Sequence, residues 1–173
     1  MISKYLQYTI MAAFREAKQR RHEFLTLEHL LYALVHDEEI ESVLHECGAD
    51  VELVKNSLLG YFDKYLEKLP AGTEQEPQET LAFQRVLQNA LFHVRNAEKE
   101  EAEAGDILAA ILEEETAHAA RTILGQGVAR VDVLRVLSHG GSIAVEDDEE
   151  SWMLEDPNSV EPNPFADDYD PET

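Results

Sequence analysis

Apolar residues recur three and four positions apart through the first 140 residues, which is the spacing that places them on one face of an α-helix. Ser3 can cap a first helix, Asp50 a fourth and Thr80 a fifth, because their side-chain oxygens can accept a free amide hydrogen of the first helical turn. The pattern predicts eight helices: about residues 3–22, 26–35 and 38–47, a fourth that starts at Asp50 and includes Phe62, a fifth that starts at Thr80 and includes Val94, and then about 104–114, 116–124 and 131–138. No segment has the alternation that is typical of a β-strand.

The most informative stretch is the turn at residues 20–34, which reads as the end of one helix and the start of the next. Thr26 is the expected N-cap, and Glu28 falls in the first turn, where a negative charge suits the helix dipole. The leucines that follow recur at helical spacing, so the second helix should bury a wide apolar stripe.

The two halves of the domain match each other. A shift of 77 residues places Leu6 on Phe83 and Ile10 on Leu87, and it also pairs Leu30 with Ile107. A shift of 80 aligns Leu44 with Leu124, which implies three extra residues near 113–122. We therefore predict an all-α fold, a duplicated four-helix repeat that forms a pseudo-two-fold eight-helix bundle. Repeat one covers about residues 3–68 and repeat two about 80–139, in a domain that spans residues 1–140.

The segment at residues 141–173 has a different composition. It contains twelve of the 36 acidic residues of the chain, four of its six prolines and no Lys or Arg. Too little apolar surface is available there to offset the entropy of ordering the backbone, so we expect a flexible, disordered acidic tail or linker. Trp152, Met153 and Leu154 form an apolar island that could dock on a partner, and the alternative is a linker with a few apolar residues.

The overall charge of −22 argues against nucleic acid or an anionic membrane as a partner, because phosphates would be repelled. The N-terminus lacks the features of a signal peptide, and no apolar run is long enough to span a bilayer. The single cysteine, Cys47, excludes an internal disulfide and is expected to be a small buried or half-buried residue before Gly48. These features predict a cytoplasmic protein.

A search for catalytic motifs finds neither a phosphate-binding glycine loop nor a nucleophile elbow, so we expect this chain to have no catalytic residues and to bind no cofactor. His22, Glu23, Glu28 and His29 lie near one turn and raise the possibility of a zinc site. The spacing of zinc proteases is absent, and we favour solvated or hydrogen-bonding histidines over a metal ion. A weak metal site at His22 and His29 stays open. His93 is expected to be a partly buried packing residue beside an inward Phe92.

The two glutamates of the turn are candidates for a recognition surface. In the second repeat Glu103, Ala104 and Gly105 replace Thr26, Leu27 and Glu28, so the two turns are not equivalent. We interpret Glu23 and Glu28 as residues that the core does not need. The alternative is that both are solvated charges at a helix end.

Residues 21–31 (RHEFLTLEHLL) and 80–94 (TLAFQRVLQNALFHV), with Ser-His-Gly at 138–140, resemble the N-terminal (Clp N) domain of Clp ATPases in the version found in ClpA, the ATPase subunit of a bacterial ATP-dependent protease. The resemblance implies an all-α duplicated module. It further implies binding of the adaptor ClpS, which delivers N-degron substrates, through Glu23, Glu28 and Thr80. In the full-length family the partners include protein substrates, a hexameric AAA+ ring and the ClpP peptidase.

Three functional hypotheses follow. The first is a docking module for adaptor and substrate, which leaves ATP hydrolysis to domains that carry the Walker motifs absent from this chain. The second is a free-standing regulator that competes for adaptor without ATPase domains. The third, a metal-dependent enzyme at the histidines, predicts zinc in the purified protein.

Overall fold

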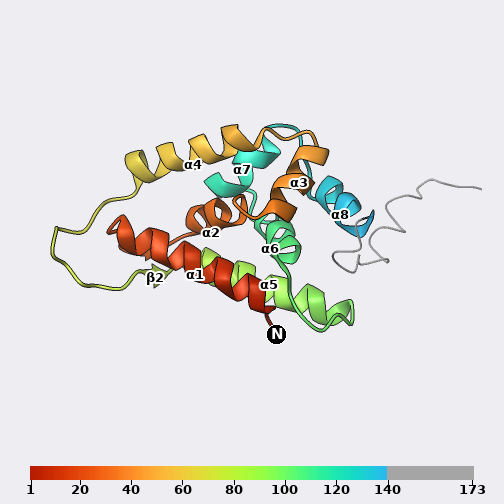
Figure 1. Ribbon diagram of the computed structural model, residues 1–173, viewed down its shortest axis with the longest axis horizontal. Helices are drawn as coiled ribbons and strands as arrows, with labels where there is room; N and C mark the ends of the chain where they lie inside the picture. Colours follow the sequence, from red (N-terminus) through yellow and green to blue (C-terminus); the bar gives the residue numbers. More distant parts are fainter. Residues whose placement is uncertain (140–173) are drawn as a thin grey trace, which may run out of the picture.

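The computed structural model describes residues 1–139, and within them the all-α prediction is confirmed (Figure 1). The predicted disorder of residues 141–173 and the apolar island at Trp152 lie outside the described residues. The helices are α1 (Lys4–Gln19), α2 (Leu27–Leu34), α3 (Glu38–Glu46), α4 (Val51–Tyr65), α5 (Leu81–Asn96), α6 (Ala104–Ile111), α7 (His118–Leu124) and α8 (Arg130–His139). Two very short strands, β1 (Phe24–Leu25) and β2 (Gln78–Glu79), accompany them.

The predicted helix starts are formed by the expected side chains. Ser3, Asp50 and Thr80 each accept a hydrogen bond from the backbone N–H three residues later. Thr26 caps α2 in the same way, with a longer contact of 3.4 Å to the N–H of His29. Each cap satisfies one of the amide donors that a first helical turn leaves without a partner.

The two short helices α2 and α6 form the centre of the bundle. They contact each other, and the longer helices pack around them: α1 and α4 against α2, and α5 and α8 against α6 (Figure 1). Residues related by the shift of 77 occupy the core at equivalent places, with exposed fractions of 0–1%. These residues are Leu30, Leu31 and Leu34 in α2 and Ile107, Leu108 and Ile111 in α6. The apolar stripes that define the repeat in the sequence are therefore the residues that join its two copies.

Two parallel backbone contacts join the repeats reciprocally. The N–H of Ser3, before α1, donates to the carbonyl of Ala102, before α6, at 3.0 Å. Its counterpart is the N–H of Thr80, before α5, which donates to the carbonyl of Leu25, before α2, at 3.1 Å. Residue numbers in the two contacts differ by 77, so the contacts are related by the internal symmetry of the duplication.

The second of these contacts extends into a short pair of strands within the all-α fold. Phe24 pairs with Gln78 and Leu25 with Glu79 in a parallel two-stranded sheet, where no strand was expected. Two residues are too few to show alternation in a sequence. The pairing forms because the connector after α4 returns past the turn after α1 and brings two backbones together.

Candidate functional site

The turn after α1 reverses the chain within three residues. Arg20 ends α1, and Arg21 follows with a φ of 60°, in the left-handed region that non-glycine residues seldom occupy. The N–H of His22 then returns to the carbonyl of Ala17 at 2.9 Å. This reversal directs the His22 side chain into the core and leaves the next two residues, Glu23 and Phe24, exposed on the surface.

The two histidines of the turn form a buried pair. Nδ1 of His22 lies 2.8 Å from Nε2 of His29, and the side chains are 2% and 0% exposed. The ring of Phe62, in α4, stacks on His29 at a centroid distance of 4.8 Å. The guanidinium carbon of Arg20 lies 4.9 Å from the centroid of the Phe62 ring, a cation–π geometry. The pair thus joins α1, α2 and α4.

Hydrogen bonding assigns the protons of this pair. Nδ1 of His29 accepts the backbone N–H of Thr26 at 3.0 Å, which completes a capping box in which histidine replaces the usual Glu or Gln. The proton of His29 is therefore on Nε2 and is donated to Nδ1 of His22. Burial and the neighbouring His22 lower the pKa of His29 to about 3, and burial and Arg20 also lower the pKa of His22. Both imidazoles are accordingly neutral near pH 7.

The predicted carboxylates do not join the histidines in a metal site. No group of three His, Cys, Asp or Glu side chains within residues 1–139 is arranged to hold a metal ion. Nδ1 of His22 and Nε2 of His29 are hydrogen-bonded to each other. Nδ1 of His29 accepts the backbone N–H of Thr26. This histidine pair stabilises the turn through hydrogen bonds that a bound ion would have to replace.

Glu23 and Thr80 flank the β1–β2 pair, Glu23 just before β1 and Thr80 just after β2. The carbonyl of Glu23 accepts the N–H of Gln78 at 3.0 Å, and two residues further along both segments Thr80 bonds to Leu25. Glu23 is exposed and Thr80 is half-buried. Phe24, 44% exposed, directly follows Glu23 and was not singled out by the sequence reasoning, although an aromatic residue two positions before a predicted N-cap was a usable signal. We call Glu23, Phe24 and Thr80 the strand-pair surface.

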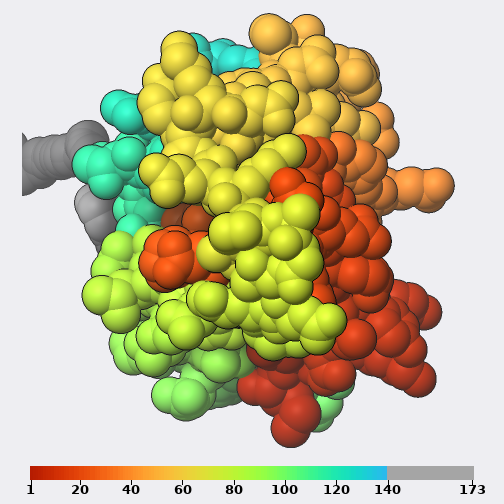
Figure 2. Space-filling model, turned by 90° about the vertical axis from the view of Figure 1, so that its left-hand side faces the viewer, coloured from red at the N-terminus to blue at the C-terminus, as the bar shows by residue number. Residues whose placement is uncertain are grey.

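The connector between α4 and α5 borders this surface. Figure 2 shows the yellow-green connector lying across this end of the molecule, beside the orange-red surface of the turn after α1 and the green surface of α5. Three segments that are far apart in the sequence therefore meet at one exposed place.

Glu28 faces a different part of the molecule, which corrects the expectation that the core does not need it. Its side chain is 5% exposed, and Oε2 accepts the backbone N–H of Ala119, in the first turn of α7, at 2.8 Å. The N-cap of α7 is Ala117, whose side chain cannot accept a hydrogen bond. The carboxylate of Glu28 therefore supplies the acceptor for the first turn of α7. In the second repeat the equivalent position is Gly105, which packs tightly against Leu137.

Two smaller expectations have different outcomes. Cys47 is half-buried, as predicted, and burial raises the pKa of its thiol. His93 is also half-buried and contacts Glu113 at 3.1 Å. Phe92, however, is 53% exposed, so its predicted inward position is wrong. Inward positions of α5 are occupied by Val86, Ala90 and Val94, and Phe92 is on the opposite face.

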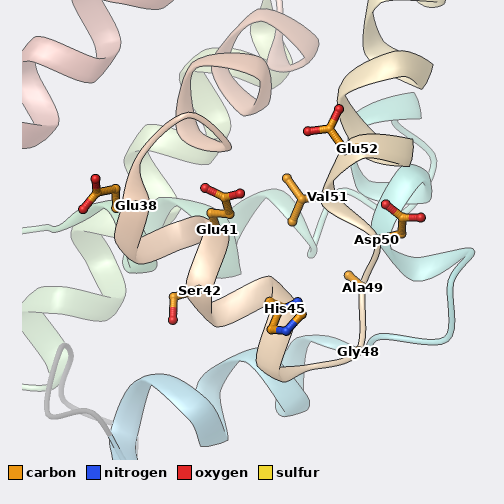
Figure 3. Close-up of a pocket in the computed structure, with 9 residues that line it drawn as sticks. All are labelled: Glu38, Glu41, Ser42, His45, Gly48, Ala49, Asp50, Val51 and Glu52. Carbon is orange, nitrogen blue, oxygen red and sulfur yellow. The ribbon is translucent and has the colours of Figure 1, made fainter.

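A separate hollow of about 620 Å³ lies between α3 and the start of α4 (Figure 3). Its lining includes the carboxylates of Glu38, Glu41, Asp50 and Glu52, and the imidazole of His45. None of Glu23, Glu28 and Thr80 lines it. The strand-pair surface therefore lies apart from this hollow, and its residues Glu23 and Phe24 are exposed.

In the part of the chain that the structure describes, no helix is long and apolar enough to cross a membrane.

Comparison with solved structures shows the same fold in the N-terminal domains of Hsp104 and of ClpV ATPases. The Hsp104 N-terminal domain of Candida albicans superposes with a TM-score of 0.71 at 15% identity, over 83% of this chain and 93% of that one. The N-terminal domain of the E. coli ClpV1 ATPase gives a TM-score of 0.66 at 20% identity, over 83% and 87%. A further ClpV N-domain, solved in complex with a VipB peptide, gives 0.64 at 20% identity, over 79% and 87%.

Sequence comparison identifies the family. A "ClpA homolog protein" of Fuscovulum blasticum is 37% identical over 139 residues, which cover 80% of this chain and 18% of that protein. This chain therefore matches less than a fifth of the length of that relative. The family model described as the Clp repeat (R) N-terminal domain matches residues 1–126. The predicted resemblance is confirmed: the chain belongs to the Clp N-terminal domain family.

Proposed function

We propose that this chain is the adaptor- and substrate-docking domain of a ClpA-like ATPase subunit, and that it binds a ClpS-like adaptor that delivers N-degron substrates. The 37% identity to a ClpA homolog supports this assignment. A relative's N-domain was solved with a bound peptide, so the fold is compatible with peptide-level recognition. ATP hydrolysis, assembly into a hexameric ring and delivery to a ClpP-like peptidase belong to the same proposal for the whole protein, as does a cytoplasmic location.

The observation that carries the proposal is the strand-pair surface. The backbones of Glu23 and Thr80 are held at the two ends of the β1–β2 pair by hydrogen bonds to Gln78 and Leu25, so a partner that contacts both would not have to order a loop on binding. Glu23 offers a carboxylate for charge-assisted hydrogen bonds. The Thr80 hydroxyl accepts the N–H of Phe83 at 3.1 Å and keeps its own O–H to donate. Phe24 adds exposed apolar area next to Glu23.

An adaptor with basic and hydrogen-bonding groups fits this surface best. The net charge of the chain is strongly negative, so such a partner would also be steered toward it at low salt. The predicted contact between Glu28 and the adaptor stays a prediction. Its 5% exposure and its bond to Ala119 favour a supporting role, in which Glu28 keeps α7 in place.

Calorimetric titration with ClpS tests the proposal. Glu23→Lys should weaken binding at least tenfold, because it replaces a hydrogen-bonding carboxylate by a like charge facing the adaptor. Glu41→Lys, an exposed charge reversal of the same kind in the α3 hollow, is the matched control and should bind as the wild type does. Equal affinity of wild type and Glu23→Lys, or no binding by the wild type, would refute the assignment.

A further inference from the structure

The outer face of α1 is both apolar and basic in an otherwise acidic protein. Tyr5, Tyr8 and Met11 are 79%, 55% and 55% exposed. Lys4 and Arg15, also exposed, lie on the same side of the helix, one at each end of the apolar residues. We call these five residues the α1 stripe. Exposed aromatic residues grouped on one helix face are unusual for a surface that meets only water.

We propose that the α1 stripe docks residues 149–156 of this same chain, Glu-Glu-Ser-Trp-Met-Leu-Glu-Asp. The charges and apolar residues of this segment complement those of the stripe. Acidic residues come first, then Trp152, Met153 and Leu154, then acidic residues again. Along the stripe, three apolar side chains lie between two cations, Lys4 and Arg15. Apolar contact and two charged ends together would fix one position of the segment on the helix.

The dimensions agree. Lys4 and Arg15 are eleven residues apart in a helix, a separation of about 16 Å at 1.5 Å per residue. An extended chain covers about 20 Å in the six steps from Glu150 to Asp156, which is within reach of the long Lys and Arg side chains. An even number of steps keeps both acids on the side of Trp152 and Leu154. Each cation can therefore face one of the acids that flank the apolar residues.

The tether is also long enough. Helix α6 contacts both α1 and α8, so the end of α8 is one intervening helix away from α1 (Figure 1). Packed helix axes are about 8–10 Å apart, which places α1 about 20 Å from α8. The thirteen steps from His139 to Trp152 can span about 40 Å. A tethered segment has an effective concentration in the millimolar range, which favours this occupant over one from a second molecule.

The charge distribution favours this pairing over docking at Leu53, another exposed apolar residue. Among the exposed large apolar residues, Leu53 follows Glu52 in the acidic surroundings of the α3 hollow, where an acidic segment would be repelled. Residues 1–21 carry five of the 14 basic residues and one acid, Glu16. Lys18 in this region already contacts Glu76 at 2.7 Å, so the proposal rests on Lys4 and Arg15.

Fluorescence of the intact 173-residue chain tests the inference, because Trp152 is its single tryptophan. We expect blue-shifted emission and protection from acrylamide, relative to the same chain in denaturant. The double variant Tyr5→Ser/Tyr8→Ser should lose the shift and quench several-fold more, while its circular dichroism stays unchanged since both residues are exposed. Tyr65→Ser, 62% exposed on α4, is the matched control and should behave as the wild type.

High salt and protein concentration complete the test. About 1 M NaCl should increase quenching in the wild type, because it screens the charged ends of the contact. Emission of a fully hydrated indole in the wild type would overturn the inference, and so would a blue shift that survives the double tyrosine variant. A shift that grows with protein concentration, together with dimers in ultracentrifugation, would assign the contact to a second copy and overturn docking within one chain.

Discussion

Oε2 of Glu28 accepts the backbone N–H of Ala119 at 2.8 Å, across 91 residues of sequence. The bond joins the start of α2 in the first repeat to the start of α7 in the second. Glu28 therefore acts as a helix cap that is supplied from a distant part of the chain, and its loss should be felt as a loss of stability.

Replacement of this carboxylate tests that role. Glu28→Ala should lower the free energy of unfolding by about 1–3 kcal/mol, because it leaves a buried backbone N–H without a partner. Glu28→Gln should cost less, since the amide oxygen can still accept the bond. Urea denaturation measures both. The exposed Glu23→Ala is the control and should stay within about 0.5 kcal/mol of the wild type. Equal stability of Glu28→Ala and the wild type would contradict the capping role.

The buried histidine pair predicts a dependence of stability on pH. The pKa of His29 is lowered to about 3 in the folded protein, from the usual histidine value of 6.5. Between these values the unfolded chain binds a proton that the folded protein does not bind. Stability from this group is therefore complete above about pH 6.5 and falls by about 1.4 kcal/mol per pH unit as the pH decreases toward 3.

Urea unfolding between about pH 7 and pH 5 measures this slope. His29→Gln is the informative variant, because Gln suits the third position of a capping box and does not titrate. We expect a flatter pH profile for His29→Gln than for the wild type. Parallel profiles would show that protonation of His29 does not limit stability at mild acid pH.

The two reciprocal helix starts predict similar costs at positions related by the duplication. Ser3 and Thr80 each accept an N–H at 3.1 Å, from Leu6 and Phe83. Ser3→Ala and Thr80→Ala should each lower the free energy of unfolding by about 1 kcal/mol, and Thr80→Ser should restore most of the loss. Thermal unfolding measures these changes, with Thr73→Ala in the exposed connector as the control. A cost at one position alone would contradict the equivalence of the two starts.

Replacement of two helical glycines by alanine should change the free energy of unfolding in opposite directions. A Cβ on Gly105 would lie 2.8 Å from Cδ2 of Leu137, whose side chain is 1% exposed. Gly105→Ala should thus cost about 1–3 kcal/mol through overpacking between α6 and α8. A Cβ on Gly60, in α4, meets nothing within 4 Å, so Gly60→Ala should gain about 0.5–1 kcal/mol. Chemical denaturation decides, and equal effects would contradict the contact with Leu137.

The sequence by itself determined the helices and their duplication. Apolar spacing and capping residues act locally, within one or two turns, so Ser3, Asp50 and Thr80 could be recognised as helix starts without knowledge of the fold. The core residues of α2 and α6 could be matched by a shift of 77 for the same reason. Glu23 could be placed beside an expected N-cap, on an exposed turn.

Only the tertiary structure decided which side chains of the turn face inward. The left-handed conformation of Arg21 rotates His22 into contact with His29 and leaves Glu23 outside, which no local pattern indicates. The partner of Glu28 is 91 residues away, and the strands that hold Glu23 near Thr80 are two residues long. Periodicity reports how each helix is divided into faces. Which distant backbone group a polar side chain meets depends on how the helices pack, because that contact exists only after the two repeats have assembled.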